Sequence, residues 1–156
     1  MRHVLAKVFI GVAITAIGVL GADNSIGTWK RNIAKSTSTP PSKNPIRSLT
    51  LVYEASDGGS KLTVTGERQD GTAINSSSTV KYDGKDYPVT GAPWDTVSVR
   101  QIDANTFTFE NKKPGGKYHN KGRSVISKDG KTMTTTTQGT DSEGKPTSGK
   151  YIYEKQ

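Results

Sequence analysis

Apolar and aromatic side chains recur at every second position along much of this chain, and this alternation constrains the fold more than any other feature. Leu49, Leu51 and Tyr53 share one parity, and Phe107 and Phe109 do the same in a later segment. Successive side chains of a β-strand point to opposite faces, so alternation is typical of a strand buried on one side. No segment after residue 22 keeps a helical period. The pattern predicts an all-β protein.

Short turn-forming pairs separate the alternating segments. Four Asp-Gly pairs begin at Asp57, Asp70, Asp83 and Asp129. The third pair is expected to form a two-residue hairpin, because glycine accepts the positive φ of such turns. A short strand should follow, since Pro88 has no N–H to donate, and the out-of-phase Ile102 indicates a β-bulge. The expected strands are 46–55, 61–68, 72–82, 87–89, 95–102, 106–112, 117–128, 131–139 and 149–154, with a strand or turn at 30–35 and a loop at 36–45.

Strands joined by short turns in this way form an antiparallel meander, whose two outer strands must be covered. Closure into an up-and-down β-barrel of about 8–10 strands removes both edges, and a β-sandwich is the alternative. The 156 residues suffice for one such domain. The interior of a barrel of this size is either filled by side chains or able to hold one small ligand.

The first 21 residues differ in character from the rest. Arg2 and Lys7 give a positive start, an apolar run follows over residues 8–20, and Gly21 and Ala22 supply small residues. This order is typical of a secretory signal peptide. The alternative is a transmembrane anchor, but about 13 residues are few for a span that takes roughly 20. We expect a signal peptide at 1–21, a single mature domain at 22–156, and a bacterial protein exported to the periplasm or the extracellular space.

Composition narrows the chemistry of the mature domain. The whole chain is only 31% hydrophobic and contains no cysteine, which excludes disulfides, thiolate catalysis and cysteine metal sites. A low apolar content is typical of partial disorder or of a sheet with one face in water, and the regular alternation favours the sheet.

Several segments together resemble a known group of proteins. Gly27-Thr28-Trp29 resembles the Gly-x-Trp entry of lipocalin-type (calycin) barrels. The stretches 81–91, 129–134 and 153–156 are similar to small exported bacterial proteins described as lipocalin-like and otherwise uncharacterised. The resemblance covers about residues 26–156 and implies a lipocalin-like barrel in which Trp29 packs across the closed end.

Catalytic residue types are scarce. His119 is the only histidine outside the predicted signal peptide, so a Ser-His-Asp triad would depend on it, and no Gly-x-Ser-x-Gly motif accompanies it. Histidine metal sites are excluded for the same reason. Carboxylate pairs at Asp83 with Asp86 and at Glu67 with Asp70 fall in turns, where solvation keeps a carboxyl from acting as an acid at neutral pH. The sequence predicts a protein that is not an enzyme and that uses no cofactor or metal, with an unrecognised hydrolase as a minor alternative.

Two kinds of binding site remain. A small hydrophobic or amphipathic ligand would contact aromatic side chains inside the barrel, for which the candidates are Tyr53, Trp94, Phe107 and Phe109. Trp94 follows Pro93 in a loop, where an indole could cover an open end. Alternatively, the protein is a structural or interaction module that binds an anionic component of the cell envelope through the basic face at 112–131. Its candidate residues are Lys112, Lys113, Lys117, Lys121 and Arg123. Nucleic acid is not expected as a partner, because few aromatic residues accompany this charge.

Overall fold

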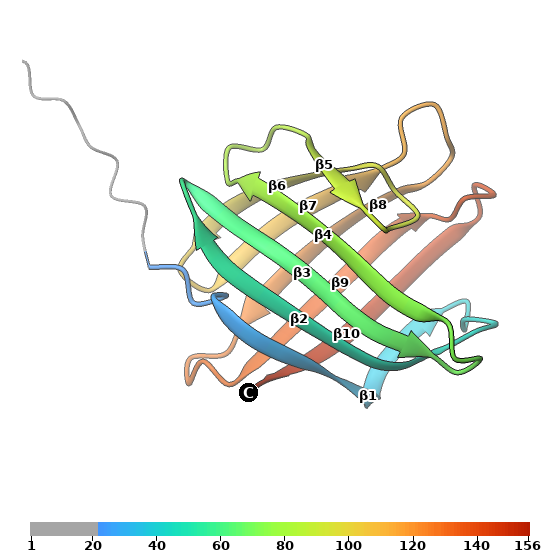
Figure 1. Ribbon diagram of the computed structural model, residues 1–156, viewed down its shortest axis with the longest axis horizontal. Helices are drawn as coiled ribbons and strands as arrows, with labels where there is room; N and C mark the ends of the chain where they lie inside the picture. The colour runs from blue at the N-terminus through green and yellow to red at the C-terminus, as the bar shows by residue number, and fades with distance from the viewer. Residues whose placement is uncertain (1–21) are drawn as a thin grey trace, which may run out of the picture.

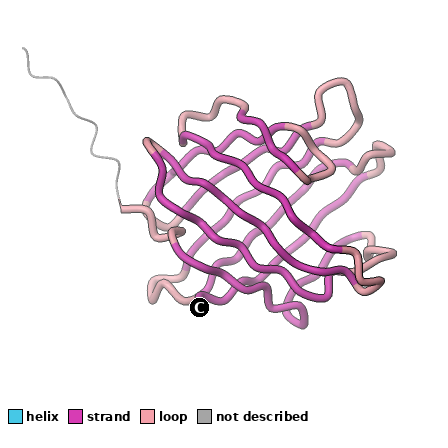
Figure 2. Tube along the Cα trace, viewed as in Figure 1, coloured by secondary structure: helices cyan, strands magenta, loops and turns pink. Residues whose placement is uncertain are grey.

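The computed structural model describes residues 22–156, which form a closed antiparallel β-barrel (Figure 1). The predicted signal peptide at 1–21 lies outside the described residues. Within 22–156 every regular element is a strand, drawn in magenta in Figure 2. No helix in this part of the chain is long and apolar enough to cross a membrane.

Ten strands make up the barrel, and each pairs with its neighbours in sequence. The strands are β1 (Gly27–Thr39), β2 (Ile46–Ser56), β3 (Gly59–Arg68), β4 (Ala73–Lys81), β5 (Tyr87–Thr90), β6 (Thr96–Asp103), β7 (Thr106–Lys112), β8 (His119–Ile126), β9 (Thr132–Thr140) and β10 (Pro146–Lys155). Pairing of β1 with β10 closes the barrel. The prediction of an all-β up-and-down barrel is confirmed, and the β-sandwich alternative is excluded.

The alternation seen in the sequence sorts side chains between the interior and the outer face. Leu49 and Leu51 of β2 are 7% exposed, and Phe107 of β7 is 6% exposed. The strand register places Leu51 opposite Trp29 on one side and Val64 on the other. The expected bulge near Ile102 is present as a register shift between Gln101 and Asp103.

The first strand is longer than the sequence suggests. β1 runs through Thr39 and so includes Ser36, which was expected in a loop; the chain leaves the strand only at Pro40. A register shift separates Asn32 from Thr37. There the Ser36 hydroxyl donates to the Asn32 carbonyl (2.7 Å) and accepts from the Ile152 amide (3.0 Å). The Ser36 hydroxyl thus takes the place of a backbone hydrogen bond that the register shift interrupts. The strand propensity of the residues does not reveal such a contact.

The stretch after β4 is not the two-residue hairpin expected at Asp83 and Gly84. Asp83 bridges to Arg100 of β6, and the Gly84 amide donates to the Val99 carbonyl (3.0 Å). The loop at 82–86 therefore folds against β6. β5 is short, as Pro88 implies, and pairs through two residues with each neighbour.

Residues 22–26, which we call the N-terminal strap, cross one end of the barrel. The Asn24 amide donates to the Ala104 carbonyl (3.0 Å), and the Asn24 side chain donates to Asn105 (2.8 Å). The turn at 104–105 joins β6 and β7, which lie across the barrel from β1. The Tyr82 hydroxyl also donates to Asp23 at 2.5 Å.

Trp29 lies directly inside this strapped end. Its side chain is completely buried, and its indole N–H donates to the Ser25 carbonyl of the strap at 2.7 Å. Trp29 therefore packs across the end of the barrel that the strap covers. The connections at 40–45, 69–72, 91–95, 113–118 and 141–145 lie at the opposite end, which we call the mouth. The barrel thus has one end covered by chain and one end formed by loops.

Candidate functional site

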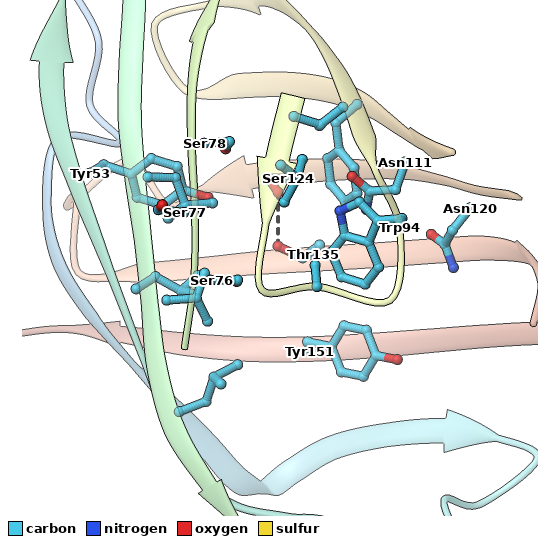
Figure 3. Close-up of a pocket in the computed structure, with 18 of the residues that line it drawn as sticks. Tyr53, Ser76, Ser77, Ser78, Trp94, Asn111, Asn120, Ser124, Thr135 and Tyr151 are labelled. Carbon is cyan, nitrogen blue, oxygen red and sulfur yellow. Dashed lines mark hydrogen bonds between the residues drawn. The ribbon is translucent and has the colours of Figure 1, made fainter. Parts of the chain in front are cut away.

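The barrel encloses a cavity of about 480 Å³ (Figure 3), and every one of the ten strands contributes at least one lining residue. Ligand pockets in proteins span roughly 300–1,000 Å³, so this volume suits one small molecule. In Figure 3, Tyr53 and Ser76 lie on one side of the cavity, and Trp94, Asn111 and Asn120 lie on the other. The interior is therefore hollow. The sequence alone did not decide between a hollow interior and one filled by side chains.

Apolar side chains line the part of the cavity above the strapped end. Met133 and Tyr153 are almost fully buried and pack with Trp29 into the core. Burial raises the pKa of the Tyr153 hydroxyl to about 12, although the nearby Arg31 guanidinium opposes this shift. The apolar wall continues through Leu49, Leu51, Leu62, Val64, Val97, Val99, Phe107 and Phe109.

Hydroxyl and amide groups interrupt this apolar surface. The Ser124 and Thr135 hydroxyls share a buried hydrogen bond of 2.8 Å, drawn in Figure 3. Asn120 also lines the cavity, and its buried Oδ1 has no partner among the described residues. The remaining polar lining residues of this kind are Ser25, Ser60, Ser76, Ser77, Ser78, Asn111 and Thr137. The cavity is amphipathic, so it suits a ligand with apolar and polar parts.

Two glycines leave space for aromatic side chains that line the cavity. A Cβ at Gly122 would lie 2.1 Å from the ring of Phe109, its cross-strand partner. A Cβ at Gly149 would lie 2.2 Å from the hydroxyl of Tyr151. Each ring occupies the space that a side chain would otherwise fill, and the centre of the barrel stays open.

An aromatic pair stands at the mouth. Trp94, in the loop between β5 and β6, stacks on Tyr118 of the loop before β8, with ring centres 5.3 Å apart and planes 18° from parallel. Burial raises the pKa of Tyr118 to about 12, with a smaller contribution from Tyr151. Both rings line the cavity, so they form part of its rim.

Two arginine side chains line the cavity. Arg31 follows Trp29 by two positions on β1 and lies over the Tyr151 ring, 4.1 Å from its centre. Its buried Nε has no hydrogen-bond partner within residues 22–156. Arg68, near the mouth, also lines the cavity and donates to the Asn44 carbonyl (3.1 Å). The side chains of the described region that line the cavity include no carboxylate.

The four aromatic candidates all reach this cavity. Tyr53 comes from β2, Trp94 from the loop before β6, and Phe107 and Phe109 from β7, and barrel closure brings these three segments together. Whether they contact a ligand stays a prediction. Sequence reasoning missed Arg31, although its parity with Trp29 was a usable signal. Two further lining residues, Thr135 and Thr137 of β9, were not among the candidates either.

The basic face expected at 112–131 is partly neutralised. Lys112 pairs with Asp86 (2.8 Å), and Lys121 pairs with Glu110 (3.4 Å). Lys113 lies 4.0 Å from Asp95. Among the described residues, the candidates that form no ion pair are Lys117 and Arg123.

His119 lies on the outer surface rather than in the cavity. Its Nε2 contacts Glu110, and this contact lowers the pKa of the Glu110 carboxyl. Both side chains are partly exposed to solvent. The pair is separate from the cavity, which leaves the minor hydrolase hypothesis without a buried carboxylate beside its histidine.

Comparisons with known proteins relate this barrel to others through structure. No family model matches the chain, and no curated protein sequence matches it. A structure of a protein of unknown function from the DUF3598 family of Nostoc punctiforme aligns with a TM-score of 0.55 and 14% identity, covering 85% of this chain and 48% of that one. This chain thus spans about half the length of that protein. An S-type phycobiliprotein lyase, CPES, from Guillardia theta aligns with a TM-score of 0.55 and 9% identity, covering 85% and 89%.

The comparison overturns the expectation that the protein is not an enzyme. That expectation followed from the scarcity of catalytic residue types, yet a barrel of similar fold is described as a lyase. Lack of a hydrolytic triad is therefore no argument against enzymatic activity in such a barrel. At 9% identity the similarity shows the fold alone, and fold by itself assigns no reaction.

Proposed function

We propose that this protein binds one small amphipathic molecule inside its barrel. The observation that carries the proposal is the cavity of about 480 Å³, whose wall combines apolar residues with hydroxyl and amide groups. Apolar surface removed from water contributes about 25 cal/mol per Å², and a few placed polar groups fix the orientation of a ligand. The phycobiliprotein lyase of similar fold supports a role for such a barrel in handling a small molecule.

The rim of the cavity supports the same function. Trp94 and Tyr118 stack on each other and line the cavity, so a ring face that is not used in this stack can contact an entering ring or chain. The unpartnered Asn120 Oδ1 offers an acceptor to a ligand hydroxyl or amide. Together the two features favour a ligand that carries both an apolar part and a polar group.

Export is a further part of the proposal. It is supported by the charge and apolar pattern of residues 1–21, which is typical of a signal peptide. β1 begins only at Gly27. Cleavage after residue 21 would therefore remove no strand of the barrel.

A neutral fluorescent probe, N-phenyl-1-naphthylamine, tests for binding in the cavity. Thr137 and Thr136 are neighbours on β9; Thr137 lines the cavity, whereas Thr136 is exposed. We expect Thr137→Trp to fill part of the cavity and lower probe affinity by about tenfold, as loss of roughly 1.4 kcal/mol would. Thr136→Trp, the matched control, should bind as the wild type does. Equal affinity of the two variants, or no binding by the wild type, would contradict the proposal.

A further inference from the structure

We infer that Arg31 recognises a single acidic group, so that the ligand of this cavity is an amphipathic carboxylate rather than a neutral molecule. The inference rests on the proposed function, because it names the chemical class of the molecule bound at that site. Three properties of the Arg31 side chain support it: its direction, its missing hydrogen-bond partner and the charge of the cavity around it.

The direction of Arg31 follows from the register of β1. Trp29 is fully buried inside the barrel, and Arg31 has the same parity before the register shift that begins at Asn32. It pairs with Tyr153 of β10, whose ring is also buried. The Arg31 side chain therefore lines the interior, two residues beyond the tryptophan at the strapped end.

The partners of Arg31 are incomplete. The ring of Tyr151 lies 4.1 Å from the guanidinium carbon, which gives a cation–π contact. Within residues 22–156 its side chain forms no ion pair, and its buried Nε donates no hydrogen bond. A buried donor without an acceptor destabilises a protein, and a charged donor does so more strongly. A ligand atom that accepts this hydrogen bond would remove the deficit.

The charge of the cavity selects the sign of that ligand atom. A guanidinium group stays protonated in proteins. The described residues that line the cavity include two guanidinium groups, Arg31 and Arg68, and neither aspartate nor glutamate. Low polarity around Arg31 strengthens its attraction for an anion. A carboxylate fits because it accepts two parallel hydrogen bonds from one guanidinium group.

The apolar residues around Arg31 account for the rest of the ligand. Leu49, Leu51 and Val64 lie on the neighbouring strands β2 and β3, and Phe107 lies across the barrel. A hydrocarbon chain or ring attached to the carboxylate would contact these side chains. The arrangement favours a long-chain acid over a small polar anion, which would leave this apolar wall uncovered.

The test compares two probes that differ only in the head group: cis-parinaric acid, a fluorescent fatty acid, and cis-parinaryl alcohol, its neutral analogue. We expect the wild-type protein to bind the acid at least about tenfold more tightly than the alcohol, as is typical of one charge-assisted hydrogen bond. This comparison requires no substitution, so it decides the question even if a variant fails to fold.

Substitution of Arg31 assigns the preference to one residue. Arg31→Met should reduce affinity for the acid about tenfold and change affinity for the alcohol less than about twofold. Arg31→Lys keeps the charge and should retain part of the preference. Arg123→Met removes an exposed arginine from the outer face of β8 and should change neither affinity. Thermal unfolding of each variant without probe shows that it is folded.

The possible outcomes distinguish carboxylate recognition by Arg31 from ligand binding in general. Equal binding of acid and alcohol by the wild type would overturn the inference and leave ligand binding intact. Equal loss of both affinities in Arg31→Met would also overturn it, because Arg31 would then act through the shape of the cavity or through water. Binding of neither probe, together with no binding of N-phenyl-1-naphthylamine, would overturn both.

Discussion

At the scale of single residues, two glycines determine how much of the barrel interior stays open. Gly122 accommodates the ring of Phe109 across the β7–β8 pair, and Gly149 accommodates the hydroxyl end of Tyr151. The sequence places both aromatic residues on inward parity, and that much could be predicted. The role of each glycine depends on which residue lies opposite it, and cross-strand register is not visible in a single segment.

Gly122→Ala should push the Phe109 ring into the cavity. The new Cβ would lie 2.1 Å from the ring, so the ring must move. We expect affinity for N-phenyl-1-naphthylamine to fall severalfold and the free energy of unfolding to fall by about 1–3 kcal/mol, which is typical of overpacking. Binding titration and urea denaturation measure the two effects.

The double variant Gly122→Ala with Phe109→Leu serves as the control. A smaller side chain at position 109 relieves the clash and should recover part of the lost affinity. Unchanged affinity in the single variant would show that the position of this ring does not limit the cavity.

At the scale of elements, the strands could be predicted well and their connections less well. Most strand positions follow from the alternation of apolar residues, and β5 is short as Pro88 requires. β1 exceeds its expected length because the Ser36 hydroxyl supplies hydrogen bonds at the register shift. The loop at 82–86 departs from a hairpin because Asp83 and Gly84 contact β6. Both differences depend on contacts with strands far away in the sequence.

The N-terminal strap covers one end of the barrel without forming a strand. Removal of residues 22–25 should therefore expose Trp29. This change deletes Ser25, whose carbonyl accepts the indole hydrogen bond, and Asp23, which accepts from Tyr82. In a Trp94→Phe background Trp29 is the sole tryptophan, so acrylamide quenching of fluorescence reports on it alone. We expect much stronger quenching in the shortened chain than in the full mature domain carrying the same Trp94→Phe substitution. Equal quenching would show that the strap does not cover this end.

For the whole molecule, buried tyrosines make stability depend on pH at the alkaline end. Burial raises the pKa of Tyr118 and of Tyr153 to about 12, and it also raises the pKa of Tyr53 and Tyr82. An unfolded tyrosine ionises near pH 10. Below that pH both states hold their protons; above it the unfolded chain releases protons that the folded chain retains, so the free energy of unfolding falls as pH rises.

We expect the barrel to lose stability between about pH 10 and 12. Urea denaturation at a series of pH values should show a falling midpoint over this range, and absorbance of tyrosinate should rise together with unfolding. Tyr153→Phe should weaken this dependence on pH. Full ionisation of all tyrosines in a chain that remains folded would contradict the burial of these side chains.

The closed barrel could be predicted from the sequence, but its hollow interior could not. Alternation identifies which side chains face inward, and the number of strands indicates closure. The volume left between the inward side chains depends on the tilt of the strands and on how far each ring reaches. Tyr53, Trp94, Phe107 and Phe109 were accordingly predicted as candidates one by one, whereas the cavity that they share with Arg31 emerges only from the closed structure.

A crystal structure of residues 22–156 with a fatty acid brominated at its terminal carbon tests the central claim most directly. Anomalous scattering locates the bromine, and the density shows the carboxylate. We predict the bromine inside the barrel near the apolar wall of β2 and β3, with the carboxylate within hydrogen-bond distance of Arg31. Bromine found only on the outer surface, or an interior filled by side chains, would contradict the account.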